Sequence, residues 1–313
     1  MAQTKMTLKP DDSSLTPHQW RNVRRYAQKA LQEAGALGVL PTPVDDILVA
    51  ANVEPINDEI LDSGFLRKLR SRAGDALKRA LSKVLGVFDA KSGLVFVDRL
   101  LKPVKQRFVM LHEAGHGFLP WQRTMYELVE DCDHALDPEA AELFDREANA
   151  FASEVLFQLD TFAEMAADHD FEIWTPIRLS KEFDASLYAS IRQYVAKSDR
   201  CCVVLVLNPP EPTNGGFEAS LRRIVPSASF ARTFSAYPWP NVYTPADPFG
   251  ALVPLGKRRS SGKRNLVLKG SDGNRHECVA ESFTQTYQVF ILIHVVGSLP
   301  RPIVVPNHLN RSI

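Results

Sequence analysis

The sequence predicts an α+β fold: a mainly helical N-terminal domain with a small β-hairpin, followed by a β-rich C-terminal domain. The length of 313 residues leaves room for two domains. Before residue 200, apolar residues recur mostly at helical spacing. After Cys201, short apolar runs alternate with clusters of Gly, Pro and Ser, which is typical of strands and turns.

The composition indicates an ordinary soluble protein, with 45% hydrophobic and 24% charged residues. The net charge of zero argues against a protein that coats nucleic acid. The 4 cysteines form no C-x-x-C pair, which favours a reducing, cytoplasmic setting. The N-terminus lacks the apolar core of a signal peptide, and the longest apolar run is too short to cross a bilayer. We therefore expect a cytoplasmic protein with no membrane contact.

Residues 1–16 are polar and are expected to be disordered. The first domain is then predicted over residues 17–160. Thr16 and Pro17 suit the N-cap and first position of a helix that runs to about Gly35. Pro41 and Pro43 break the chain, and a second helix is expected over 44–51.

Residues 64–85 predict a basic amphipathic helix, since an apolar stripe runs between many Lys and Arg residues. Such a helix is either a solvated surface element, a contact for nucleic acid or a partner, or a lid on the acidic residues 127–147. Residues 84–99 predict a hairpin. Its second strand, with Leu94, Val95 and Phe96, is a candidate for pairing with an extended substrate, and the alternative is a purely structural hairpin.

The segment His112-Glu113-Ala114-Gly115-His116 matches the pattern HExxH. On a helix predicted over 105–118, His112 and His116 share one face and can bind a single Zn²⁺. Glu113 lies beside the open coordination position and can act as the general base. Gly115 within the helix indicates close packing at this face. The alternative is two histidines and a glutamate on an ordinary surface helix.

A zinc site of this kind needs a third protein ligand. We predict Glu147, which lies at the edge of an apolar helical stripe, where a half-buried carboxylate needs a partner. Glu142 and His134 are alternatives, and Glu147 could instead be a solvated residue of a charged first turn. One Zn²⁺ per chain is expected.

Three motifs together resemble the ImmA/IrrE group of metallopeptidases. Arg107-Phe108 precedes HEAGH, residues 147–152 read Glu-Ala-Asn-Ala-Phe-Ala, and residues 40–47 are similar to the group's N-terminal stretch. The resemblance covers roughly residues 20–200. It implies a zinc peptidase that cleaves a cognate transcriptional repressor in a bacterial stress or mobile-element response. One departure is the end of the later helix, which reads Leu156-Phe157-Gln158 and leaves the substrate groove undefined.

Residues 161–200 predict a helical, helix-turn-helix-like segment. Its second helix offers only Arg192, Gln193 and Lys197 to bases, so we expect it to pack on the zinc domain. Residues 201–313 predict a β-rich, sensor-like domain with strands near 203–207, 221–225, 265–268, 277–280 and 288–296. Residues 257–264 predict an exposed, mobile basic loop. Trp239, Tyr243 and His294 are candidates for ligand contact or simple packing.

The sequence thus predicts a zinc-dependent endopeptidase with a protein substrate. Glu113 is its expected base, and Tyr126, His134 and His169 are candidates for the donor that stabilises the oxyanion. Two other hypotheses remain: a DNA-binding regulatory protein with a structural or silent zinc site, and a toxin–antitoxin component that acts through partner binding.

Overall fold

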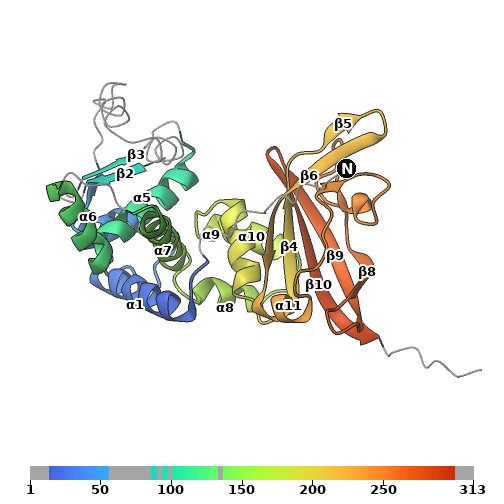
Figure 1. Ribbon diagram of the computed structural model, residues 1–313, viewed down its shortest axis with the longest axis horizontal. Helices are drawn as coiled ribbons and strands as arrows, with labels where there is room; N and C mark the ends of the chain where they lie inside the picture. Colours follow the sequence, from blue (N-terminus) through green and yellow to red (C-terminus); the bar gives the residue numbers. More distant parts are fainter. Residues whose placement is uncertain (1–13, 56–85, 90–93, 98–100, 133–136, 300–313) are drawn as a thin grey trace, which may run out of the picture. The chain divides into compact units, whose positions relative to one another are not determined.

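The computed structural model describes residues 14–55, 86–89, 94–97, 101–132 and 137–299 (Figure 1). The chain divides after Tyr194 into two compact units. The N-terminal unit is mainly helical and the C-terminal unit is mainly antiparallel sheet, so the predicted α+β class is confirmed. Disorder was expected over residues 1–16. Residues 1–13 and the predicted basic helix at 64–85 lie outside the described residues, whereas residues 14–16 are described and Thr16 caps α1.

Five helices of the N-terminal unit frame its core: α1 (Pro17–Glu33), α2 (Val44–Ala50), α5 (Pro103–Phe118), α6 (Pro120–Cys132) and α7 (Pro138–Leu156). The predicted start of α1 is confirmed, because Thr16 and Gln19 form a capping box. Pro103 begins α5, as expected from its position ahead of the HExxH segment.

Helices α5 and α7 pack closely where Gly115 meets Ala148 and Phe151. A Cβ atom added to Gly115 would lie 3.1 Å from Phe151 Cδ1 and 3.3 Å from the Ala148 Cα. The predicted apolar stripe of α7 is fully buried: Ala148, Phe151, Ala152, Val155 and Leu156. The prediction of close packing at Gly115 is therefore confirmed.

A small sheet lies beside α5 and contains β1 (Glu54–Pro55), β2 (Gly86–Asp89) and β3 (Leu94–Val97) in the order β1-β3-β2. The predicted hairpin is confirmed, since β2 and β3 pair antiparallel. However, β1 pairs parallel with β3 at Leu94 and Val95. Strand β3 therefore lies between β1 and β2, which are the outer described strands of this sheet. Pairing of an extended substrate with Leu94–Val97 would require β3 to be an edge strand.

Within the described residues, the N-terminal unit also contains α8 (Thr161–Ala167), α9 (Trp174–Glu182) and most of α10 (Leu187–Ala196), which crosses the boundary after Tyr194. Phe157, Phe162 and Phe183 pack ring against ring, with centroids 4.9–5.9 Å apart. The turn after α9 is held to α5, since Arg107 Nε lies 3.2 Å from Asp184 Oδ2. Arg107 also donates to the carbonyl of Thr42 at 2.6 Å. The helix-turn-helix-like segment therefore packs on the domain that carries HExxH, as expected.

The C-terminal unit is an antiparallel sheet in the order β5-β6-β4-β10-β9-β8, with β7 paired to β6. Its elements are β4 (Cys202–Leu207), β5 (Glu211–Thr213), β6 (Gly216–Pro226), α11 (Ala228–Thr233), β7 (Val242–Tyr243), η1 (Gly250–Leu252), β8 (Arg264–Lys269), β9 (Arg275–Gln285) and β10 (Gln288–Leu299). All the strands expected from the sequence are present. None of the helices described has both the length and the apolar character needed to cross a bilayer.

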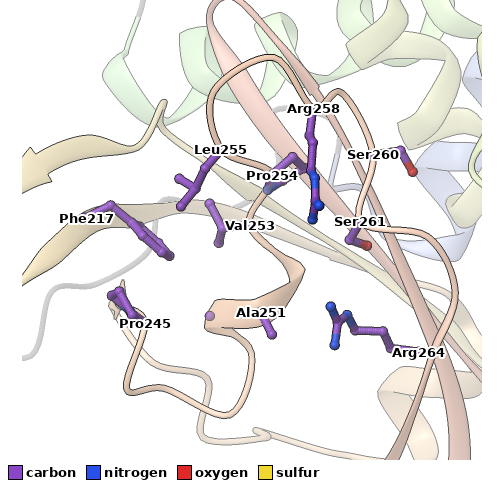
Figure 2. A pocket seen from close by; sticks show the side chains of 11 residues that line it. Phe217, Pro245, Ala251, Val253, Pro254, Leu255, Arg258, Ser260, Ser261 and Arg264 are labelled. Carbon is purple, nitrogen blue, oxygen red and sulfur yellow. The ribbon is translucent and has the colours of Figure 1, made fainter.

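The basic loop 257–264 is exposed, as predicted, but it is attached to β9. Ser260 forms a bridge with Phe283, and Thr284 donates its backbone N–H to Arg259 O at 2.8 Å. Ser261 Oγ accepts from Ser282 N at 3.1 Å. These bonds hold the loop along one side of a cavity (Figure 2).

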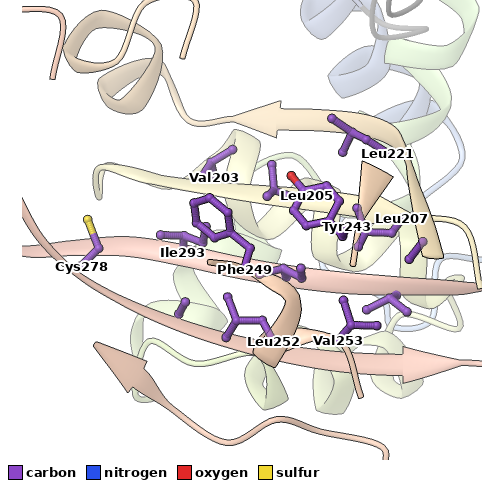
Figure 3. Close-up of a cluster of buried hydrophobic side chains, with 14 of the residues drawn as sticks. Val203, Leu205, Leu207, Leu221, Tyr243, Phe249, Leu252, Val253, Cys278 and Ile293 are labelled. Atoms are coloured by element: carbon purple, nitrogen blue, oxygen red, sulfur yellow. The ribbon is translucent and has the colours of Figure 1, made fainter. Parts of the chain in front are cut away.

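The C-terminal core gathers aliphatic and aromatic side chains from one face of the sheet and from the segment around η1 (Figure 3). Tyr243 is completely buried there, and Trp239 packs against the same cluster. His294 is buried on β10, in register with Cys202 and Val279. Of the two alternatives for these three residues, the structure favours packing.

We expect Gly115→Leu to destabilise the protein by about 1–3 kcal/mol, because a larger side chain would force α5 away from the α7 backbone. Urea unfolding followed by circular dichroism measures the change. Lys105→Leu, an added leucine at an exposed position of the same helix, serves as the control and should shift the midpoint little. Equal effects of the two substitutions would contradict this account of the helix contact.

Candidate metal centre

Two histidines of α5 and one aspartate of α7 converge. His112 Nε2 and His116 Nε2 lie 3.1 Å apart, and Asp145 Oδ1 lies 4.0 Å from His112 Nε2. Among the described residues, these three side chains form a group whose ligand atoms all lie within 4.8 Å of one another. The histidines are one helical turn apart, so α5 presents both on the face toward α7.

The outer nitrogen of each imidazole contacts a side-chain amide oxygen. His116 Nδ1 lies 2.7 Å from Gln122 Oε1, and His112 Nδ1 lies 3.1 Å from Asn149 Oδ1. Because Gln122 Nε2 donates to Glu147 Oε2 and to Phe144 O, the oxygen of this amide must face His116. His116 Nδ1 therefore carries the proton, and its Nε2 presents a lone pair. His112 Nδ1 faces Asn149 Oδ1 in the same way, so this nitrogen also carries the proton and His112 Nε2 also presents a lone pair.

In this protonation state, two lone pairs point at each other across 3.1 Å. They would repel unless a positive species lay between them. Burial lowers the pKa of His112 to about 3, aided by the nearby His116, and burial lowers the pKa of His116 to about 4. Both rings are thus neutral at pH 7, the form that binds metal. The donor set fits a divalent cation.

Glu113 and Tyr126 flank this group. Glu113 is buried on α5, and the Tyr126 ring packs edge-on against His116, with centroids 5.3 Å apart. The pKa of Tyr126 is raised, first by burial and then by the charges of Asp145 and Glu113. The phenol consequently stays protonated near neutral pH. It can donate a hydrogen bond beside the surface that carries His112, His116 and Asp145, which we call the metal face.

Glu147, the third ligand predicted from the sequence, is buried as expected but lies outside the converging group. Its Oε2 accepts from Trp121 Nε1 and from Gln122 Nε2, each at 2.7 Å. Asp145, and not Glu147, belongs to the converging group. Asp145 is one turn before Asn149, which contacts His112, so both residues lie on the side of α7 that faces the histidines.

The other candidates lie elsewhere. Glu142 is exposed and lies 3.6 Å from Arg146 on the same helix. His169 is exposed near the end of α8 and is not part of the converging group. His134 lies outside the described residues. Tyr126 is thus the oxyanion-donor candidate that the structure brings to the site.

Two histidines and an aspartate on two packed helices, with a buried glutamate beside them, form a group that could hold a metal ion. Residues 76–189 match the family model described as the IrrE N-terminal-like domain, Peptidase_M78. The matched region contains the whole converging group, and the resemblance indicated by the motifs is confirmed. The family is one of metal-dependent peptidases.

A search of solved structures finds a Mycobacterium tuberculosis transcriptional regulator that is 12% identical to this chain. The match covers 88% of this chain and 78% of that one, with a TM-score of 0.47. No curated protein matches the sequence.

The lowered pKa values predict how the stability of the metal-free protein depends on pH. Below pH 6.5 the unfolded chain binds protons at both positions, whereas the folded chain does not bind them until about pH 4 and pH 3. The free energy of unfolding should therefore fall as the pH falls from 6.5 to 4.

Urea unfolding of chelator-treated protein at several pH values tests this expectation. His116→Gln should flatten the dependence, while substitution of the exposed His169 by Gln should leave it unchanged. Identical slopes for wild type and His116→Gln would contradict the assignment.

Proposed function

We propose that this protein is a zinc-dependent endopeptidase. The observation that carries the proposal is the convergence of His112, His116 and Asp145 beside the buried Glu113, within a region that matches a peptidase family. Two imidazoles and one carboxylate form a ligand set typical of catalytic zinc, which keeps a further position open.

We propose His112, His116 and Asp145 as the zinc ligands. The two rings are already neutral and oriented, and the Asp145 side chain is 65% exposed, so it can turn toward the ion at little cost. A zinc ion in this site would act as a Lewis acid and lower the pKa of water to about 7. The exposure of Asp145 also indicates that the site is open to solvent on this side.

The residues around the ligands would perform the proton transfers. The Glu113 carboxylate accepts a proton from the attacking water and delivers it to the leaving amine. Tyr126, whose raised pKa keeps its hydroxyl protonated, is the proposed donor to the oxyanion. Both side chains are placed by helices that contact the histidines, so their geometry does not depend on a remote loop.

The proposed substrate is a protein, namely a cognate transcriptional repressor in the cytoplasm, as the resemblance to ImmA/IrrE proteins implies. The exposed carboxylates of Glu139 and Glu142 precede Asp145 of the converging group on α7. They favour a substrate segment that carries Lys or Arg.

Glu113→Gln should abolish cleavage while keeping the metal, because an amide cannot accept the proton but occupies the same volume. Mass spectrometry detects cleavage within a proteome-derived library of proteins and peptides, and elemental analysis measures zinc. Glu164→Gln removes the same charge from an exposed position of α8 and should keep full activity. Undiminished cleavage by Glu113→Gln would refute the proposed role.

A further inference from the structure

Gln122 connects the metal face to a carboxylate behind it. This side chain is completely buried on α6, and Glu147 is 5% exposed. Gln122 Oε1 contacts His116 Nδ1 at 2.7 Å, while Gln122 Nε2 donates to Glu147 Oε2 at 2.7 Å. We propose that Glu147 and Gln122 are positioning residues for His116, and that Glu147 acts through Gln122 and is not a metal ligand. For the metal chemistry, this rests on the function proposed above.

The orientation of the Gln122 amide is determined at both ends. If the amide flipped, its N–H groups would face the His116 N–H and its oxygen would face the Glu147 carboxylate. Neither contact is a hydrogen bond, and Phe144 O would also lose its donor. A fully buried amide cannot replace these partners with water. The Glu147 charge therefore selects one amide orientation, and this orientation selects the His116 tautomer.

The Glu147 carboxylate is itself held in place from α6. Trp121 Nε1 donates to Glu147 Oε2, the same oxygen that accepts from Gln122. Consecutive residues of α6 thus supply two donors to one oxygen of a buried carboxylate. Hydrogen bonds to a charged acceptor are stronger than neutral ones, so this charge increases the polarisation of the Gln122 amide toward His116.

The arrangement should matter for metal affinity. An acceptor at the outer nitrogen fixes the plane of a ligating imidazole and makes the other nitrogen more basic. Loss of such a partner reduces metal affinity by about 10–100-fold without removing a ligand. A direct ligand behaves differently, because its loss changes the coordination itself.

The test uses the full chain and four variants: Glu147→Gln, Gln122→Glu, the double variant Gln122→Glu/Glu147→Gln, and Asp145→Asn. The double variant exchanges the two groups. The carboxylate, now on α6, would accept from His116. The amide, now on α7, would donate to that carboxylate and accept from Trp121. The donors and acceptors between His116, position 122, position 147 and Trp121 are thus restored, while Phe144 O loses its donor in this variant and in Gln122→Glu alike. Zinc affinity is measured by competition with a fluorescent chelator, and the His116 tautomer by ¹⁵N NMR of the metal-free protein.

Each single positioning variant should lose about 10–100-fold in affinity, still bind one zinc at saturation, and show a mixed His116 tautomer. The double variant should recover both properties to within a few-fold. If Glu147 were itself a metal ligand, Glu147→Gln would reduce zinc affinity at least as much as Asp145→Asn does. The double variant would then not recover this affinity. Wild-type affinity and tautomer in both single variants would equally overturn the proposal. Neither readout depends on peptide cleavage, so failure of the peptidase proposal would be seen separately.

A second observation concerns the C-terminal unit, where a cavity of about 400 Å³ lies between the end of β6, the segment around η1 and the basic loop. Arg258 and Arg264 extend into this space near Ser261, opposite Phe217 and Leu255 (Figure 2). Within the described chain, neither guanidinium has a hydrogen bond or an ion pair, and no acidic residue lines the cavity. From this charge and apolar pattern we infer a binding site for a small amphipathic anion.

The physical basis is complementarity. Arg258 and Arg264 would each gain a partner from a carboxylate or phosphate, the groups that a guanidinium binds best. Leu255 is 47% exposed and would be covered by the apolar body of the ligand. The volume suits a small molecule. The wall is formed in advance, because the loop is hydrogen-bonded to β9 through Arg259 and Ser261.

The probe is 1-anilinonaphthalene-8-sulfonate, an amphipathic anion, with uncharged N-phenyl-1-naphthylamine as its counterpart. Arg258→Gln/Arg264→Gln should weaken binding of the anion about tenfold or more and leave the uncharged probe unaffected. Leu255→Ser should weaken both. The matched control Lys257→Gln/Arg259→Gln removes the same charge from side chains outside the cavity and should change either affinity less than about twofold. Equal losses in the two double variants, or no effect of Leu255→Ser, would overturn the assignment.

Discussion

The metal face depends on the close contact of α5 and α7 at Gly115 and Ala148. Gly115 lies between the two histidines of its helix, next to His116. Ala148 lies between Asp145 and Asn149 of the other helix. Because both residues at the crossing are small, the backbones approach closely, and the residues on either side of the crossing meet. The contact therefore determines which side chains of α7 reach the histidines: Asp145 approaches His112, and Asn149 binds its outer nitrogen.

Three acidic residues near this crossing have different environments and therefore different chemistry. Asp145 is largely exposed, and its Oδ1 lies 4.0 Å from His112 Nε2. Glu113 is buried beside Tyr126, where a carboxylate can exchange protons in a site shielded from bulk water. Glu147 is buried against Trp121 and Gln122, which satisfy its charge. Glu113 and Glu147 are thus two glutamates that are buried to a similar extent. Their different neighbours suit one to proton transfer and the other to a fixed hydrogen-bonded position.

The sequence predicted the elements of this site better than it predicted their partners. Caps, prolines and apolar stripes are local signals, so α1, α5 and α7 could be placed from them. The burial of Glu147 was also predicted, on the argument that a half-buried carboxylate needs a partner. Its partners come from α6, however, and how α6 packs is a tertiary property that helical periodicity does not contain. The position of β3 was missed for a related reason: β1 is a two-residue strand ending in Pro55, which is too short to produce a strand pattern.

Helix α6 connects these observations, since it supplies Trp121, Gln122 and Tyr126 to the surroundings of the metal face. Gln122 and Tyr126 are one turn apart, and both contact His116. The helix begins at Pro120, directly after α5, and the buried Leu119 between them donates its N–H to Gly115 O at 2.9 Å. Such a short connection leaves little freedom to the first turn of α6. Gln122 is therefore placed by the same chain segment that contains His116, only six residues away. The precision of the Gln122 contact with His116 therefore follows from the local turn at Leu119 and Pro120.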